Sequence, residues 1–220
     1  MQTQTLPIAS DAAQATAYTL LMADQPIAAP TDTVYGVMCR FDSTDGIDRL
    51  YEVKQRPPQK AIPVLIADIE QLTRITPTPV TRVAEVLMAH FWPGPLTLVL
   101  PALTTLPANL TAGQPTVAVR MPAHDALRQI IRRTGPLAAT SANLSGGAET
   151  TSAAEVLAQL DGRISLVLTE DETETPPQRT MVASTIVDVS LADQNPRILR
   201  PGPIADTVRT LLQQEFGYSC

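Results

Sequence analysis

Three cationic side chains, Lys54, Arg56 and Lys60, lie within seven residues of a chain that has only 16 lysines and arginines. Pro57 and Pro58 lie between them, and because proline fixes its own φ and restricts the residue before it, a helix is not expected to continue here. Cations on such a stiff loop lose less entropy when they bind a phosphate than cations on a flexible loop. The segment therefore indicates an anion site, with a solvated turn after a helix as the alternative.

Two further polar clusters each follow a predicted strand. Residues 30–36 (Pro-Thr-Asp-Thr-Val-Tyr-Gly) offer hydroxyls and an acid at a strand end, which suits a small polar ligand in an α/β crevice. Residues 140–147 (Thr-Ser-Ala-Asn-Leu-Ser-Gly-Gly) combine hydroxyls, a carboxamide and a glycine pair, which can present several donors to an anion. The alternatives are a β-turn capped by threonine and an ordinary glycine-terminated loop.

Arg120 ends a run of alternating apolar residues, 116–120. A buried strand rarely ends in arginine without a partner, so this side chain is expected to face a carboxylate or a phosphate. Residues 184–188 (Ser-Thr-Ile-Val-Asp), followed by Arg200-Pro201-Gly202, form a weaker signal of the same kind.

Composition narrows the class of protein. The 220 residues carry a net charge of −6, which argues against a broad nucleic-acid-binding surface. His90 and His124 are the only histidines, and neither has a ligand partner at metal-binding spacing. Cys39 and Cys220 are too few for a disulfide framework. With no membrane-length apolar run, no visible secretory signal and no nucleophile motif, we expect a cytoplasmic protein whose chemistry depends on positioning and electrostatics.

Helical and strand patterns alternate along the chain, which predicts an α/β fold. The helix over 11–22 is expected to bury Ala12, Ala15, Tyr18, Leu21 and Met22. The acidic, proline-bearing segment 170–178 is expected to be a mobile surface loop. No convincing domain break is visible, so we expect one domain over 1–205 and a helical tail over 206–220. The other expected helices are 45–54, 80–91, 125–133, 153–160 and 204–216, and the expected strands are 26–30, 62–66, 96–100, 116–120, 136–139, 164–168, 185–189 and 197–199.

The motifs together resemble the YrdC-type threonylcarbamoyl-AMP synthases, in their order along the chain and over roughly residues 8–205. They are Pro30-Thr-Asp-Thr-Val-Tyr-Gly, Lys54-x-Arg56-Pro, Arg120, Ser141-Ala-Asn-x-Ser-Gly, Ser184-Thr and Arg200-Pro-Gly. The resemblance implies a single-domain, twisted sheet of mixed parallel and antiparallel strands, with flanking helices and a deep, positively lined cavity. It implies synthesis of threonylcarbamoyl-AMP and pyrophosphate from L-threonine, bicarbonate and ATP. The product would pass to the machinery that transfers the threonylcarbamoyl group to tRNA.

The resemblance also implies roles for individual residues. At the threonine end it implies Thr33, Arg120, Thr140 and Ser184, with Arg120 on the amino-acid carboxylate. At the nucleotide end it implies Lys54, Arg56, Lys60, Thr116, Ser141, Asn143 and Arg200, of which Lys54, Arg56 and Ser141 would act in catalysis. Mg2+ is expected to arrive with ATP, and no protein ligand for a metal is expected.

The chain also departs from the family. Some members carry a histidine in the strand after the cationic loop, whereas residues 62–66 (Ile-Pro-Val-Leu-Ile) have none. Longer members have a second C-terminal domain, and we expect this chain to belong with the shorter members. Two alternatives stay open at this point: a carbamoyl-transfer module of the same fold, and an RNA-binding module without synthase activity. The acidic net charge counts against strong direct binding of nucleic acid.

Overall fold

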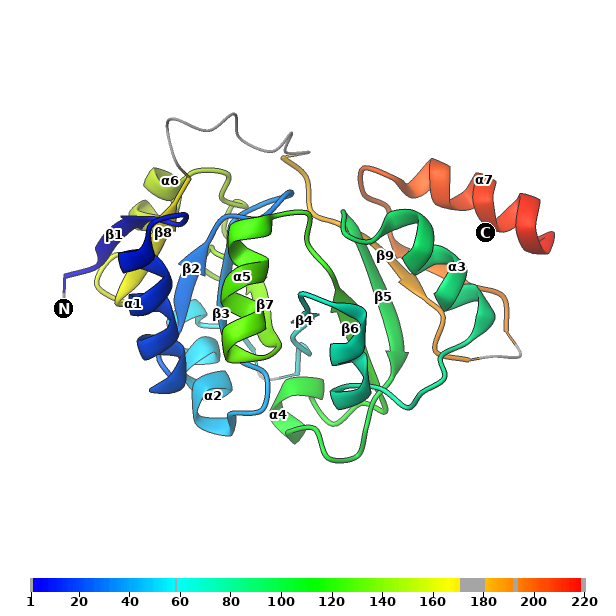
Figure 1. Cartoon of the computed structure of the whole chain (residues 1–220), viewed down its shortest axis with the longest axis horizontal. Coiled ribbons are helices and arrows are strands. Elements are labelled where there is room, and N and C mark those ends of the chain that lie inside the picture. Colours follow the sequence, from blue (N-terminus) through cyan, green and yellow to red (C-terminus); the bar gives the residue numbers. More distant parts are fainter. Residues whose placement is uncertain (1, 58, 171–180, 192–193, 219–220) are drawn as a thin grey trace.

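The structure is a computed structural model that describes residues 2–57, 59–170, 181–191 and 194–218. Within these ranges, ten strands form one sheet in the order β1-β8-β2-β3-β7-β4-β6-β5-β9-β10 (Figure 1). The sheet contains both parallel pairs (β1 with β8, β2 with β8, β4 with β6, β5 with β9) and antiparallel ones (β2 with β3, β3 with β7, β4 with β7, β5 with β6, β9 with β10). The predicted α/β fold with a mixed sheet and flanking helices is confirmed.

The strands are β1 (Gln4–Pro7), β2 (Ile27–Ala29), β3 (Gly36–Arg40), β4 (Val64–Leu65), β5 (Leu96–Pro101), β6 (Thr116–Arg120), β7 (Leu137–Ser141), β8 (Leu166–Thr169), β9 (Thr185–Asp188) and β10 (Arg197–Arg200). The helices are α1 (Asp11–Met22), α2 (Thr44–Lys54), the 3-10 helix η1 (Ile69–Arg74), α3 (Arg82–Phe91), α4 (Ala108–Thr111), α5 (Asp125–Thr134), α6 (Ala153–Leu160) and α7 (Ala205–Phe216). None of the described helices has the length and hydropathy needed to cross a bilayer.

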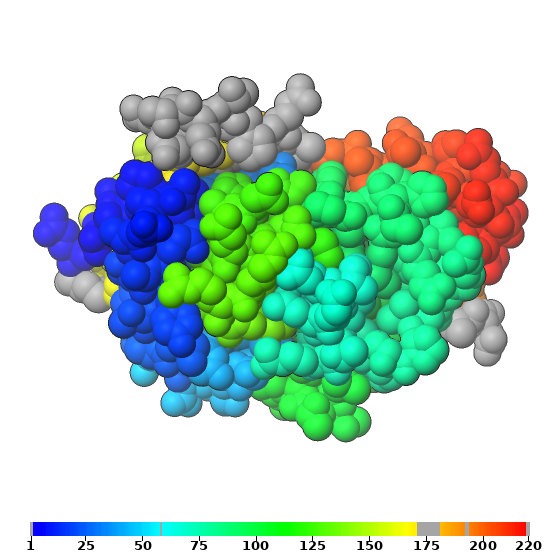
Figure 2. Space-filling view, in the orientation of Figure 1, coloured from blue at the N-terminus to red at the C-terminus, as the bar shows by residue number. Residues whose placement is uncertain are grey.

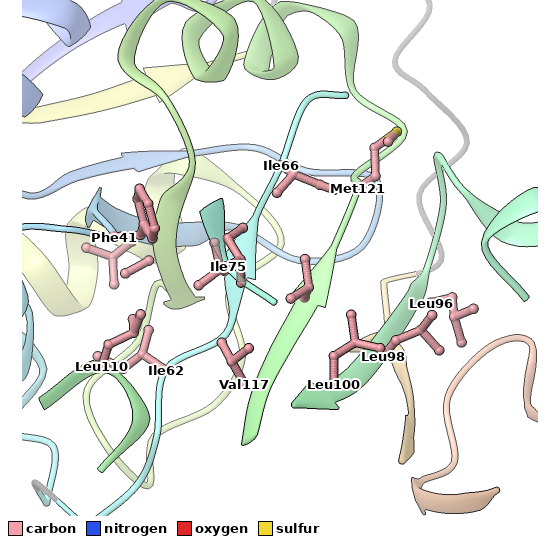
Figure 3. Close-up of a cluster of buried hydrophobic side chains, with 14 of the residues drawn as sticks. Phe41, Ile62, Ile66, Ile75, Leu96, Leu98, Leu100, Leu110, Val117 and Met121 are labelled. Atoms are coloured by element: carbon pink, nitrogen blue, oxygen red, sulfur yellow. The ribbon is translucent and has the colours of Figure 1, made fainter. Parts of the chain in front are cut away.

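Two apolar clusters lie on the sheet. Helices α1 and α5 lie side by side over one part of it (Figure 1), and they share the smaller cluster, with Ala17 and Ile130 among its members. The larger cluster gathers side chains from α2, α3, α6 and α7, and Leu96, Leu98 and Leu100 enter it from alternate positions of β5 (Figure 3). In the space-filling view α1 (blue) and α7 (red) lie at opposite ends of the long axis (Figure 2).

Serine or threonine residues cap the N-termini of four helices, and each of these helices begins within two residues of its predicted start. The hydroxyls of Ser10, Ser43, Thr81 and Ser152 each accept a hydrogen bond from a backbone N–H in the first turn of α1, α2, α3 and α6. A cap of this kind satisfies a donor that would otherwise be unpaired and contributes about 1 kcal/mol. Helix α2 ends at Gln55 in the left-handed conformation, which turns the chain out of the helix directly after Lys54.

The bounds of α1 are confirmed, but within its predicted buried stripe only Leu21 is confirmed and the other four residues are wrong. The buried residues are Ala13, Gln14, Ala17 and Leu21, whereas Ala12, Ala15, Tyr18 and Met22 are exposed. Alanines occur on both faces of this helix, so apolar spacing alone does not choose between them. The choice comes from packing, because the small side chains of Ala13 and Ala17 let α1 approach the sheet and α5 closely.

Four elements were not predicted: β1, β3, η1 and α4. Strand β3 is the most important of these, because it directly follows the Thr-Asp-Thr segment, pairs with both β2 and β7, and is buried along most of its length. Burial on both faces removes the apolar–polar alternation that identifies a strand in a sequence. The expected strand over 62–66 is reduced to the two residues of β4, and residues 171–178 of the expected mobile loop, like Cys220, lie outside the described ranges.

Candidate active site

A cavity of about 390 Å³ lies over the sheet, between segments that are far apart in sequence. Its floor follows the pairing register, because residues paired across strands point to the same face: Leu65 pairs with Arg120, Ala118 with Val99, and Thr97 with Ile186. All six of these side chains line the cavity. The predicted site residues that line it are Thr33, Arg56, Arg120, Thr140, Ser141, Ser184 and Arg200.

Arg120 is held at one end of this cavity by three acceptors. Its Nε donates to the carbonyl oxygen of Gly94 at 3.0 Å, its Nη1 donates to Oγ1 of Thr33 at 2.7 Å, and its Nη2 forms an ion pair with Asp32. Burial lowers the pKa of Arg120, while the negative charge of Asp32 opposes this effect. The guanidinium is thus a fixed, buried cation at the end of β6, as the strand pattern predicts.

The hydroxyls of Thr31 and Thr33 form a short hydrogen-bond chain beside Arg120. Oγ1 of Thr31 donates to the carbonyl oxygen of Val34 at 2.7 Å and lies 3.0 Å from Oγ1 of Thr33. Because Thr31 has already used its only hydroxyl hydrogen, the hydroxyl of Thr33 is the donor of this pair. Thr33 accepts from Arg120 as well, so it has one lone pair left, and a ligand that meets this hydroxyl must supply a donor.

Ser184 and Arg200 form the wall on the C-terminal side. The guanidinium of Arg200 donates to the backbone carbonyl of Ser184 from Nε at 3.0 Å and from Nη2 at 2.8 Å, and Nη2 also reaches Oγ of Ser184 at 3.2 Å. The hydroxyl of Ser184 lies 2.7 Å from that of Thr97 on β5. Burial lowers the pKa of Arg200, and the charge of Glu149, which also lines the cavity, opposes this.

Lys54 is buried, with 1% of its surface exposed. Its Nζ donates to the backbone carbonyls of Ser141 and Asn143, the latter at 2.6 Å, and to Oδ1 of Asn143 at 3.3 Å. The backbone N–H of Ser145 donates to the carbonyl of Lys54 at 2.8 Å. An ammonium has three donors, so all three are used, and Lys54 fastens the Ser141–Gly147 segment to the end of α2.

The same loop is closed by its own side chains. Oγ of Ser141 donates to Oδ1 of Asn143 at 2.5 Å, and Nδ2 of Asn143 donates to the carbonyls of Leu144 at 3.0 Å and Gly147 at 2.7 Å. Ser141 therefore reaches the cavity from a loop whose shape Asn143 and Lys54 hold.

Burial and the nearby charge of Arg56 lower the pKa of Lys54 to about 7. The three oxygen acceptors around Nζ favour the protonated form, and a phosphate group beside Nζ would favour it further. The lysine can thus gain charge when an anion enters the site.

Arg56 lines the cavity, whereas Lys60 and Thr116 do not. The guanidinium of Arg56 donates to the carbonyl oxygens of Lys60 at 3.2 Å and Ala61 at 3.0 Å, and the hydroxyl of Tyr51 donates to the same Lys60 carbonyl at 3.0 Å. The exposed Lys60 thus shapes the loop through its backbone, and the nucleotide contacts assigned to its side chain and to Thr116 stay predictions. Lys54 and Asn143 also lie outside the lining and act on the loop behind it. Pro58 lies outside the described residues.

The sequence predicts no individual role for Asp32, although it lies in the 30–36 motif, and no role at all for Gly94, Thr97 and Glu149, which also belong to this site. The pairing of Asp32 with Arg120 could have been predicted. Asp32 lies between the two threonines of the 30–36 motif, and its carboxylate is the kind of partner that the strand pattern predicts for Arg120. Gly94 contributes a backbone oxygen, and Thr97 occupies one position of an apolar strand, so neither has a recognisable signal in the sequence.

Comparison with known proteins gives one consistent result. The Sua5/YciO/YrdC family model, described as "Telomere recombination", matches residues 19–202. The threonylcarbamoyl-AMP synthase of Bacillus subtilis is 43% identical over 192 residues, which cover 86% of this chain and 53% of the relative. The threonylcarbamoyl-AMP synthase of Pyrococcus abyssi is 41% identical over 177 residues, which cover 80% of this chain and 50% of the relative. The chain thus spans about half the length of these two relatives.

A solved structure agrees with this result. The crystal structure of Pyrococcus abyssi Sua5 complexed with L-threonine superimposes with a TM-score of 0.83 at 35% sequence identity. The match covers 94% of this chain and 58% of that one.

Proposed function

The chain belongs to the Sua5/YciO/YrdC family, and from this premise we propose that it makes threonylcarbamoyl-AMP and pyrophosphate from L-threonine, bicarbonate and ATP. The relatives named above are threonylcarbamoyl-AMP synthases. The observation that carries the proposal is the convergence of Arg56, Arg120 and Arg200 on one cavity of an acidic protein. Three cations from distant segments suit a ligand with several negative charges.

The proposed reaction requires no nucleophile from the protein. Bicarbonate supplies CO2 by releasing hydroxide, the amine of threonine adds to the carbon of CO2, and the proton that the amine loses combines with the hydroxide to give water and the carbamate. An oxygen of this carbamate attacks the α-phosphorus of ATP, the bond to the β-phosphate oxygen breaks, and pyrophosphate leaves with that electron pair. Because negative charge develops around phosphorus and on the leaving group, fixed cations lower the barrier.

The proposed threonine end comprises Thr33, Arg120, Thr140 and Ser184. The carboxylate of threonine would bind the N–H groups that Arg120 has left on Nη1 and Nη2. Thr33 is an acceptor toward any ligand, so it would take a hydrogen bond from the hydroxyl or the amino group of threonine.

The proposed nucleotide end comprises Lys54, Arg56, Ser141, Asn143 and Arg200, with Lys60 and Thr116 as further predicted contacts. Arg56 and Arg200 already line the cavity. Lys54 would reach a phosphate by exchanging its longest hydrogen bond, the one to Oδ1 of Asn143.

Mg2+ would enter with ATP as part of the substrate. The described residues contain no group of three or more histidine, cysteine, aspartate or glutamate side chains placed to hold a metal, and Mg2+ commonly binds through substrate phosphates and water. We propose a cytoplasmic reaction whose product passes to the tRNA threonylcarbamoyl-transfer machinery, without strong binding of nucleic acid by this chain.

We further propose that residues 1–205 form the catalytic unit and residues 206–220 a helical tail. Val208 and Leu212 of α7 are buried in the larger apolar cluster. The tail would therefore support the cavity from behind rather than act as a separate module.

The test is pyrophosphate release from ATP by the purified 220-residue chain, measured with threonine and bicarbonate together and with each left out. Release is expected only when both are present. Serine is expected to be the poorer substrate, because a pocket shaped for the extra methyl loses about 1 kcal/mol of contact without it. Equal release without an amino acid would refute the proposal.

A further inference from the structure

Asp32 lies behind Arg120 and does not line the cavity. Its side chain is almost fully enclosed, with 5% of the residue exposed, and Arg120 is 6% exposed. The carboxylate oxygen Oδ1 accepts a hydrogen bond from Nη2 of Arg120. Arg120 thus faces the cavity, and Asp32 lies on its other side, toward the protein interior.

The three bonds of Arg120 determine which of its donors are left for a ligand. A guanidinium has five N–H groups, of which one goes to Gly94, one to Thr33 and one to Asp32. Since Nε is used, the two N–H groups without an acceptor among the described residues are one on Nη1 and one on Nη2. Which N–H groups are left for a carboxylate in the cavity therefore depends on the rotation in which the guanidinium is held.

Asp32 differs from the other two acceptors because it alone carries a charge. Gly94 and Thr33 offer a neutral carbonyl and a hydroxyl, and Gly94 is fixed by its own N–H, which donates to the carbonyl of Met121 at 2.8 Å. The neighbouring Arg200 contributes to lowering the pKa of Arg120, so the cations of the cavity disfavour one another. Asp32 offsets this repulsion where Arg120 is buried.

The pair is poorly suited to stabilising the fold. Burying two charges costs desolvation energy that their attraction often fails to return. Oδ2 of Asp32 is buried and has no hydrogen-bond partner among the residues that the structure describes, which adds to the cost. A buried carboxylate with half of its acceptor capacity unused is better explained by what it does to Arg120.

We propose that Asp32 is a positioning residue that sets the rotation of Arg120 for the carboxylate of the amino-acid substrate. This inference rests on the proposed function and deepens it, since it assigns the control of threonine binding to a residue that does not touch threonine. It predicts that Asp32 acts on threonine only through Arg120.

The first experiment compares steady-state pyrophosphate release by the wild type and Asp32→Asn, which keeps the shape of the side chain and removes its charge. The KM for threonine is expected to rise about tenfold or more, and the KM for ATP to change by less than about twofold. Thr76→Val is the matched control, because Thr76 is also buried, its Oγ1 has no described partner and it lies outside the cavity lining. This control should leave both KM values unchanged.

The second experiment is a double-mutant cycle with Arg120→Ala. Asp32→Asn should weaken threonine binding in the wild-type background and have no further effect once Arg120 is absent, as titration calorimetry with threonine would measure. Additive effects of the two substitutions would overturn the inference. So would a threonine KM that stays at the wild-type value, or KM values for threonine and ATP that rise equally.

Asp32→Glu serves if the Asn variant does not fold, because it keeps the charge and displaces it by one methylene. Its threonine KM is expected to rise, by less than Arg120→Ala raises it, with the ATP KM unchanged. No change, or an equal rise in both, would again overturn the inference. A wild-type chain whose pyrophosphate release does not depend on threonine would instead refute the proposed function, and the inference with it.

Discussion

Lys54 and Arg56 belong to one sequence motif, but their side chains have different surroundings: Lys54 ends α2, and Arg56 lies in the loop that follows. Nζ of Lys54 is enclosed by oxygens of the Ser141–Gly147 segment, whereas Arg56 donates to backbone oxygens of its own loop and lines the cavity. Removing Lys54 would leave the buried carbonyl of Asn143 without a donor among the described residues, whereas the carbonyl of Ser141 keeps the N–H of Asn143. Removing Arg56 would leave no buried carbonyl unpaired. The sequence motif treats the two residues alike, but their expected contributions to stability differ.

Arg56→Ala is expected to lower the rate of pyrophosphate release about 100-fold, because a cation near the developing phosphate charge is lost. The free energy of unfolding should change by less than about 1 kcal/mol, since the side chain is only half-buried and loses no buried partner. Denaturant titration and the pyrophosphate assay together check both statements. Normal turnover of the variant would support the alternative interpretation, in which the loop is a solvated turn.

Lys54→Met is expected to lower activity to a similar degree and to make stability depend differently on pH. The pKa of Lys54 in the folded protein, about 7, lies below its value of about 10.4 in an unfolded chain. Between these values the unfolded chain binds more protons, so stability rises with pH, by up to about 1.4 kcal/mol per pH unit. Below pH 7 both states are protonated and this dependence disappears.

The measurement is the difference in unfolding free energy between the wild type and Lys54→Met, from pH 6 to pH 8.5. The wild type should gain stability relative to the variant above pH 7. Burial raises the pKa of the Cys39 thiol, which has the opposite effect at higher pH, but it acts on both proteins and cancels in the difference. A difference that is constant over this range would contradict the prediction.

At the scale of elements, β9 and β10 extend the sheet beyond β5 and supply one wall of the cavity. Arg200 at the end of β10 folds back onto Ser184, the residue before β9, and Gly202 lies directly against that backbone. A Cβ built on Gly202 would lie 2.5 Å from the backbone N of Thr185 and 2.7 Å from the carbonyl oxygen of Ala183. Position 202 therefore requires glycine, because a side chain there would collide with the backbone of residues 183–185.

Gly202→Ala is expected to displace β10 and lower activity at least tenfold, since Arg200 and Ser184 would separate. Gly217→Ala is the matched control. Gly217 has a φ of +72° with open space around it, so its substitution costs about 1 kcal/mol of backbone strain without touching the site. Equal activity of the two variants would show that the contact at Gly202 is unimportant.

At the scale of the whole molecule, the proposed ligands bridge segments from residue 31 to residue 200, which line one cavity. Ligands that bind only the folded chain stabilise it by mass action, by about 2.7 kcal/mol at a hundredfold excess over Kd. For a chain of this length that corresponds to a rise in Tm of about 5–10 °C.

Differential scanning fluorimetry with threonine and a non-hydrolysable ATP analogue checks this expectation. Each ligand should raise Tm, and Arg120→Ala should lose the response to threonine while keeping the response to the analogue. If Arg120→Ala instead loses the response to the nucleotide, the assignment of the two ends of the cavity is reversed.

The sequence alone determined the α/β class, most helices and strands to within a few residues, and several of the segments that line the cavity. These features depend on local information: apolar periodicity, capping hydroxyls, and prolines and glycines at the ends of elements. The strands that escaped prediction, such as β3, are short or buried on both faces, so their side chains follow no alternation.

Only the tertiary structure decided how the polar residues of the cavity are connected. Asp32 and Arg120 are 88 residues apart in the chain, and Lys54 and Asn143 are 89 apart, so no local pattern relates them. Their pairing comes from the order of the strands and the register between them. A residue type and its position in a motif predict that a cation will meet an anion, but whether that anion is a ligand or another part of the protein depends on what the fold brings beside it.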